Sequence, residues 1–400
     1  MQRHKMPIQA ALGLIFFILL MDVVGMSILY PVAPYIVRRY SSHALMLTVL
    51  TAIYATAQFF AAPVLGKCGD RYGRRPVLLV SLFGSAIGYI LFGIGGALWV
   101  LFLSRLIDGI TAGNQSTAAA YIADVSTPEA RAKHFTLIGM AWGLGLIVGP
   151  ALGAAFGQIS LAAPAVIAAV LSLLSALLNV VLLPESLPRD RRETTPLRLG
   201  DLNPFLSIGE MARKPGLGWL LLVLCLFNFA FNGINSTETL FLIEKFATQP
   251  WQLGVLLVLA GSTIVLVQRL VQPLVQHYGE QGIAIIGLVG QSLGALATFV
   301  APTVWLVYPL TMFRTITSGL IFPTLGALMT SRVSPREQGM LMGVTTALSS
   351  LMSILGPLWA GAVYDRMMPG APYWMGSGVF VLAALTLTYA PVWRCVCRST

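Results

Sequence analysis

Several ionisable residues lie inside long apolar stretches of this sequence, among them Asp22, Arg105 and Asp108. Asp22 lies in the apolar run 8–36, whereas Arg105 and Asp108 lie in the run 98–122. A charge in a hydrocarbon environment is costly, so ionisable residues in such runs indicate a functional site. Arg105 and Asp108 are three residues apart and would share one face of a helix. A buried carboxylate beside a guanidinium can take up and release a proton, which is the chemistry that these residues predict.

The depths of Asp22 and Arg105 can be compared if both runs are helices that cross a membrane. At about 1.5 Å per residue, Arg105 lies about 12 Å from the outer boundary and Asp22 about 21 Å from the inner one. In a core about 30 Å thick these levels nearly coincide, so we expect the two to pair, with Asp108 about one turn deeper. The pair either couples protons or only locks two helices together. We favour coupling, because buried ion pairs contribute little net stability.

Amide side chains form a stripe in the apolar run 217–241. Asn228, Asn232 and Asn235 would share one helix face, and Glu238 lies close to it. The stripe either hydrogen-bonds a neighbouring helix or lines a wet cavity. Arg314, in the middle of another run, is expected to face the protein interior. The residues that we assign to a substrate cavity are Asn114, Gln115, Asn228, Asn232, Asn235, Glu238 and Arg314.

The segment 66–76 reads GKCGDRYGRRP and is expected to turn between two antiparallel helices. Its glycines, at 66, 69 and 73, supply the backbone freedom of a tight turn. Asp70 and its neighbouring cations can form a charge network at the ends of the helices. The simpler alternative is a turn whose positive charges only set the orientation of the chain in the membrane. The related segment PLVQHYGEQG (273–282) keeps Gly279 but lacks the aspartate and the arginines, so the network would be one-sided.

The run 141–157 reads AWGLGLIVGPALGAAFG and contains a glycine at every fourth position from Gly145 to Gly157. Small residues at this spacing allow helices to pack closely in membranes. Pro150 would bend the helix. Any tight bundle could use such a motif, so the pattern alone does not specify a function.

The elements that position these residues follow from composition. Of the 400 residues, 56% are hydrophobic and 10% are charged, whereas a soluble domain carries about 25% charged residues. Continuous apolar runs of about 20 residues indicate transmembrane helices, and a barrel would show alternating strands instead. The first run carries Asp22 and is too long for a cleavable signal peptide. The twelve expected spans are 8–36, 44–65, 77–96, 98–122, 135–157, 162–183, 217–241, 252–276, 282–301, 303–330, 339–363 and 373–393.

The basic residues reveal the topology. The net charge is +10, and most of the 25 lysines and arginines fall on one side of the membrane if the N-terminus is inside. This positive-inside bias predicts that both termini are cytoplasmic. The net positive charge is therefore explained by the membrane topology, and it implies no nucleic-acid partner.

The chain divides into two related halves. A polar stretch, 184–215, separates them. STPEAR (126–131) precedes GPALGA in the first half, and VSPREQ (333–338) precedes GPLWAG at the same separation in the second. Such six-helix repeats, with a site near the midplane, are typical of secondary transporters. The expected parts are an N-terminal six-helix half (1–186), a cytoplasmic linker (187–216) and a C-terminal six-helix half (217–400).

These motifs together resemble the major facilitator superfamily. The spacing G-x-x-x-D-R-x-G-R-R resembles its signature between helices 2 and 3, with Cys68-Gly69 in place of a small apolar pair. The pattern G-x-x-x-G-P-x-x-G resembles helix 5 of its antiporters. Within the superfamily, the chain is most similar to the twelve-helix drug:proton antiporters, above all the tetracycline/proton antiporters. The matching stretches include MDVVGMSILYPVAPYI (21–36), DRYGRRPVLL (70–79), AAYIAD (119–124), ARAKHF (130–135) and LPES (183–186).

The resemblance implies roles for the matching residues. Asp22 matches the helix-1 acid and would be protonatable, and Arg105 matches the helix-4 arginine and would adjust the pKa of that acid. Asp108 stands where these exporters usually carry an uncharged residue, and we add it to the proton-coupling group. The implied inner gate consists of Gly66, Asp70, Arg71, Gly73, Arg74 and Asp124. The implied helix-5 antiporter motif consists of Gly145, Gly149, Pro150 and Gly153.

The implied protein is an all-α membrane protein with the major facilitator fold. It would be a monomer in the cell inner (plasma) membrane that exports an amphipathic small molecule, multidrug or tetracycline-like, in exchange for protons, and so would confer antibiotic resistance. We expect no enzyme activity, because no Walker loop, nucleophile elbow or metal spacing occurs, and no cofactor or metal. A lipid or lysolipid flippase and a metabolite transporter are the alternatives. A non-transporting sensor would need a large loop domain, which the chain lacks.

Overall fold

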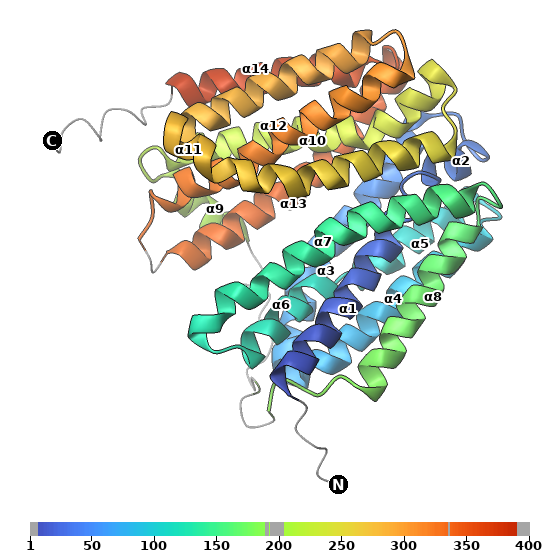
Figure 1. The fold of residues 1–400 in the computed structure, drawn as a ribbon, viewed down its shortest axis with the longest axis vertical. Coiled ribbons are helices and arrows are strands. Elements are labelled where there is room, and N and C mark those ends of the chain that lie inside the picture. The colour runs from blue at the N-terminus through green and yellow to red at the C-terminus, as the bar shows by residue number, and fades with distance from the viewer. Residues whose placement is uncertain (1–6, 189–191, 193–203, 335–336, 390–400) are drawn as a thin grey trace, which may run out of the picture. The chain divides into compact units, whose positions relative to one another are not determined.

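The computed structural model describes residues 7–188, 192, 204–334 and 337–389, and these residues contain helices but no strand. This confirms the all-α prediction. The helices are α1 (Ile8–Ser27), α2 (Ala33–Arg38), α3 (Ala44–Tyr72), α4 (Arg74–Ile94), α5 (Leu98–Ile110), α6 (Asn114–Val125), α7 (Pro128–Gly157), α8 (Ala163–Val181), α9 (Pro204–Ala212), α10 (Leu217–Phe246), α11 (Pro250–Val300), α12 (Val304–Thr330), α13 (Gln338–Arg366) and α14 (Ala371–Tyr389) (Figure 1). Of the expected linker, residues 189–191 and 193–203 lie outside the described residues.

Within the described residues, eleven helical segments are long and apolar enough to cross a membrane. The expected span 98–122 is not one of them, because it is divided into α5 and α6. At the break, the Gly113 N–H donates to the carbonyl of Thr111 (2.7 Å) instead of to a residue four positions earlier. The Thr111 hydroxyl also bonds to the carbonyl of Ile107 at 2.9 Å. Such hydroxyl bonds to the preceding turn bend helices, and neither short helix reaches the length of about 20 residues that a span requires.

One other expected boundary was wrong. The first span ends at Ser27 rather than at residue 36, and α2 is a separate short helix. Pro31 explains this end, because proline disfavours helical geometry in the residue before it and lacks an N–H. The two spans expected at 252–276 and 282–301 are confirmed as two helices, because α11 is broken between them at Gly279, where φ is 72° and ψ is 160°.

The chain forms two compact units. Unit 1 comprises Met1–Ser42, Ile53–Arg198 and Gln249–Gly261, and unit 2 comprises the remaining segments. Each unit therefore includes the first turns of a helix whose remainder belongs to the other. In unit 2, the Asp365 carboxylate caps α3, because it accepts hydrogen bonds from the backbone N–H groups of Ala44 (2.8 Å) and Leu45 (3.0 Å). An acidic group at a helix N-terminus is stabilising.

Both units are apolar inside and outside. In unit 1, Ile15, Ile18 and Leu82 are completely buried in a cluster that joins several helices. Large apolar side chains also face outward, such as Trp99 (65% exposed) and Trp305 (67% exposed). A helix that is apolar all round is suited to lipid rather than to water. The helices are therefore arranged as expected of a membrane bundle, with the few polar groups inside.

Candidate functional site

Asp22 and Asn114 meet across α1 and α6. The Asn114 amide donates a hydrogen bond of 2.6 Å from Nδ2 to Oδ1 of Asp22. Asn114 is the first residue of α6 and is only 5% exposed, so the break after α5 places this amide inside the unit. Both residues were assigned to candidate sites from their positions in the sequence, but their contact could not be foreseen without the break. Gln115, the next residue, is exposed.

Arg105 pairs with Asp108 on its own helix. Its Nη1 lies 3.3 Å from Oδ2 of Asp108, whose side chain is 5% exposed. The guanidinium also lies over the rings of Phe92 (4.8 Å) and Tyr89 (5.7 Å) of α4. No ion pair joins Arg105 to Asp22 in the described part of the chain, so the expected pairing was wrong. Similar depth does not ensure that two side chains face each other, and a carboxylate three residues along the same helix is the closer partner.

The two pairs lie close enough for the Asp22 and Asp108 carboxylates to interact electrostatically, and we call Asp22, Asn114, Arg105 and Asp108 together the proton cluster. It contains more acid than base. Asp22 and Asp108 supply two carboxylates from α1 and α5, and Arg105 supplies one guanidinium. One Arg105 nitrogen, Nη2, and the Asn114 carbonyl oxygen are buried and have no hydrogen-bond partner among the described residues. A desolvated group of three charges with one acid in excess becomes neutral when it binds one proton. The arrangement is therefore able to hold and release a proton.

The glycines of α7 bring its backbone against α1, the helix of Asp22 (Figure 1). A Cβ added at Gly149 would lie 2.9 Å from the carbonyl oxygen of Val24, and one added at Gly153 would lie 2.9 Å from Pro31 Cγ. The carbonyl of Gly145 accepts a 2.9 Å hydrogen bond from the Ser27 hydroxyl. No larger residue fits at these positions without displacing α1.

A charge network joins the start of α4 to α3 and α6. Arg74 contacts Asp70 (Nη2–Oδ1, 2.7 Å) and Asp124 (Nε–Oδ2, 3.1 Å). We call these three residues the Arg74 network. Arg71 lies outside it, over the ring of Tyr72 at 5.7 Å. The turn expected around three glycines was partly wrong, because positions 66 and 69 lie within α3 and only Gly73 has a positive φ, of 104°.

Two further residues complete this region and were not assigned to it from the sequence. The Glu185 carboxylate caps α4, because it accepts hydrogen bonds from the backbone N–H groups of Arg74 (2.8 Å) and Arg75 (3.3 Å). The Ser186 hydroxyl donates to Asp124 at 2.9 Å. Both belong to the stretch LPES, which could have indicated them. The contacts of Glu185 and Ser186 could not be foreseen, because LPES lies far along the chain from the 66–76 segment.

In unit 2, Arg314 is buried and pairs with Glu238, across α12 and α10, at 2.6 Å. The predicted interior position of Arg314 is therefore observed. Two amides of the stripe bond within α10 itself, since Asn228 donates to the carbonyl of Leu224 (2.9 Å) and Asn232 to that of Asn228 (2.8 Å). Asn235 is exposed.

Comparison with known families decides what kind of protein carries these features. The family model described as Major Facilitator Superfamily matches residues 15–357. The chain belongs to this superfamily. The predicted resemblance and fold class are thereby confirmed, and the protein is a multi-pass membrane transporter.

Individual members of the superfamily are similar over almost the whole chain. The tetracycline resistance protein, class C, of Escherichia coli is 35% identical over 94% of both chains. Multidrug resistance protein 2 of Bacillus subtilis (strain 168) is 26% identical over 95% of both. The crystal structure of the human organic anion transporter MFSD10 (TETRAN) has a TM-score of 0.70 at 24% identity, covering 96% of this chain and 100% of that one. These relatives do not favour the flippase or sensor alternatives.

Proposed function

We propose that this transporter exports an amphipathic, drug-like molecule in exchange for protons by alternating access. The observation that carries the proposal is the buried cluster of Asp22, Asn114, Arg105 and Asp108, in which acid exceeds base. A group with one carboxylate in excess can bind a proton and release it again. Substrate and proton would then exclude each other from the same site, which is the requirement of antiport.

The relatives support the drug class. The similarity to a tetracycline resistance protein extends over 94% of both chains. We infer from this that the substrate is multidrug or tetracycline-like and that transport confers antibiotic resistance. The expected cavity residues of unit 2, Glu238 and Arg314, would stabilise that unit rather than bind a proton, because their charges balance.

Two packing features support alternating access. The Arg74 network and the Glu185 cap would form an inner gate that closes and reopens during the cycle. The glycine face of α7 against α1 would seal the path around Asp22, as expected of an antiporter motif. We further propose two six-helix halves, cytoplasmic termini, a location in the plasma membrane, a monomeric state and no nucleic-acid partner, on the grounds of charge distribution and sequence repeats.

Reconstitution of the full chain into proteoliposomes tests the proposal. Tetracycline is the first probe, followed by a panel of amphipathic drugs, and a pH gradient is imposed across the vesicle membrane. The expected result is uphill accumulation that disappears when a proton ionophore collapses the gradient. Addition of substrate should also release protons that a trapped pH dye detects. Uptake that is indifferent to the gradient for every compound would contradict proton antiport.

A further inference from the structure

Unit 2 contains a cavity between α10, α12 and α13 that no residue of the proton cluster lines. Its volume is about 350 Å³, within the range of about 300–1,000 Å³ that small-molecule sites occupy. Among the described residues that line it, none is ionisable. The cavity therefore suits an uncharged group, because an ion would lose its hydration there without gaining a counter-charge.

One wall of the cavity, on α13, is rich in hydroxyl groups. The Thr345 hydroxyl donates to the carbonyl of Met342 (3.0 Å) and the Ser353 hydroxyl to that of Ser349 (3.0 Å), which leaves their lone pairs available. In the described part of the chain, the hydroxyls of Thr346 and Ser349 have no protein partner. These hydroxyl groups can both donate to and accept from a ligand.

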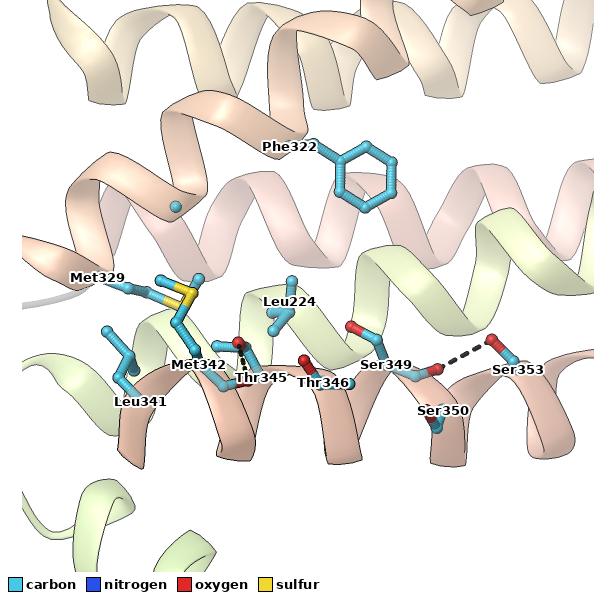
Figure 2. Close-up of a pocket in the computed structure, with 11 residues that line it drawn as sticks. Leu224, Phe322, Met329, Leu341, Met342, Thr345, Thr346, Ser349, Ser350 and Ser353 are labelled. Atoms are coloured by element: carbon cyan, nitrogen blue, oxygen red, sulfur yellow. Dashed lines mark hydrogen bonds between the residues drawn. The ribbon is translucent and has the colours of Figure 1, made fainter. Parts of the chain in front are cut away.

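The opposite wall is apolar and aromatic. Figure 2 shows Phe322 reaching from α12 toward the hydroxyl groups of α13, with Leu224 of α10 beside them. Phe322 is 46% exposed. It is held by edge-to-face contacts with Phe227 (centroids 5.1 Å apart) and Phe231 (6.1 Å apart). The ring is therefore oriented before a ligand arrives and keeps surface for contact with a second ring system.

We propose that this cavity binds the uncharged polycyclic part of the exported molecule. Its rings lie against Phe322, and its hydroxyl or carbonyl groups bond to Thr346 and Ser349. The inference rests on the proposed export function for the class of ligand. It separates recognition of the neutral body of the substrate, in unit 2, from the proton chemistry of Asp22 and Asp108 in unit 1.

Two glycines provide a matched steric test. Gly326 lines the cavity and Gly343 does not, yet a Cβ added at either position meets nothing within 4 Å. In Gly326→Leu the side chain fills the cavity, so the half-saturating concentration of tetracycline should rise about tenfold or more, the effect of a few misplaced methylenes in a pocket. Gly343→Leu should stay within about twofold of the unmodified protein. Equal effects of the two substitutions would overturn the proposal.

Cysteine protection supplies a test that does not depend on transport. In a background with all four native cysteines changed to serine, Ser349→Cys is alkylated by a maleimide with and without ligand. Tetracycline and the neutral steroid estradiol should slow the reaction, whereas the cation tetraphenylphosphonium should not. Gly343→Cys, on the same helix outside the cavity, should react at an unchanged rate. Protection by the cation alone, or by none of the three, would overturn the proposal.

The two experiments distinguish this inference from the proposed function. Protection of Ser349→Cys by the neutral compounds without gradient-driven transport would uphold the cavity and refute proton antiport. Gradient-driven transport of tetracycline without protection would uphold antiport and refute the cavity.

Discussion

Arg105 of unit 1 and Arg314 of unit 2 each pair with a carboxylate inside the protein, and the two arginines are paired differently. Arg105 of unit 1 pairs with Asp108, three residues along the same helix. Arg314 of unit 2 pairs with Glu238 of another helix, at 2.6 Å. The second ion pair joins α12 to α10, whereas the first lies within α5 and its guanidinium contacts α4 through the rings of Phe92 and Tyr89. Asp22 gives unit 1 an additional carboxylate, which unit 2 does not match beside Arg314.

This difference means that the unit 1 site can change its charge, whereas a change of charge in the unit 2 pair would leave a buried ion without its counter-ion. In unit 2 the two charges balance, so removing either leaves a buried ion without a partner. In unit 1 one carboxylate is in excess, so binding a proton makes the cluster neutral. A buried ion pair therefore indicates function only when the net charge of the whole site and the helices that carry the paired residues are taken into account.

Asp22→Asn should have the largest effect. The amide keeps the shape and the contact with Asn114 but cannot release a proton, so gradient-driven transport should fall to the level of protein-free vesicles. Downhill exchange of labelled for unlabelled substrate should persist, because exchange needs no net proton cycle. Both rates are measured in the same proteoliposomes. If Asp22→Asn kept gradient-driven transport, Asp108 would become the better candidate for the proton site.

Asp70→Asn should reduce transport by about tenfold or more, since it removes one of two carboxylates that hold the Arg74 guanidinium at a proposed gate. Substrate binding in detergent should be unchanged. The equivalent loop of unit 2 supplies the control. Gly279 there has a positive φ like Gly73, and Glu280→Gln beside it should leave transport unaltered. Equal flux in the two variants would mean that the Arg74 network only fixes topology.

The sequence predicted the helices well and their partners less well. Long apolar runs located the membrane helices because hydrophobicity depends on composition alone. The break after Ile110 was missed because Thr111 and Gly113 are small and weakly polar, and nothing in the apolar pattern marks where backbone bonding changes. This break then decided the site, since it puts Asn114 rather than Arg105 against Asp22.

Contacts between distant segments were the other limit. Helical spacing indicated correctly that Arg105 and Asp108 share a face, because such a relation is local. It could not show that Glu185 caps α4 or that Glu238 reaches Arg314, since these contacts depend on how the helices pack. Helical spacing also could not show that Asn228 and Asn232 bond to the backbone of α10, as an asparagine in a helix can.

Arg314→Leu should destabilise the protein by about 3–5 kcal/mol, because Glu238 is left buried without its counter-ion. The double variant Glu238→Leu/Arg314→Leu should recover most of this loss and retain gradient-driven transport. The same pair of changes at Asp108 and Arg105 should abolish transport. Thermal unfolding in detergent and proteoliposome flux measure the two quantities. A double variant in unit 2 that is stable but inactive would show that both arginines serve the transport cycle.

Gly149→Ala should destabilise unit 1 by about 1–3 kcal/mol, the usual cost of overpacking. The added methyl would lie 2.9 Å from the carbonyl oxygen of Val24 and would push α7 away from α1. Gly139, on the same helix, has nothing within 4 Å of an added Cβ. Gly139→Ala should therefore be neutral or slightly stabilising. Equal unfolding temperatures of the two variants would show that the α1–α7 contact is loose.

Glu337→Gln should have the smallest effect and tests a contact of unit 2 outside the spans. Hydrogen bonds from Lys214 (2.5 Å) and from the backbone and hydroxyl of Ser334 lower the pKa of Glu337 from 4.5 to about 2. A lowered pKa means that the carboxylate stabilises the fold above about pH 4.5 and that this contribution is lost as the pH falls toward 2. The unfolding temperature of Glu337→Gln should therefore lie slightly below that of the unmodified protein at pH 7, and this difference in unfolding temperature should narrow by pH 3.

Transport by Glu337→Gln should be unchanged, because the Lys214–Glu337 pair, unlike the Arg74 network, is not placed at the proposed gate. A gap that widened on acidification would contradict the lowered pKa, and a loss of flux would mean that unit 2 has a gate of its own.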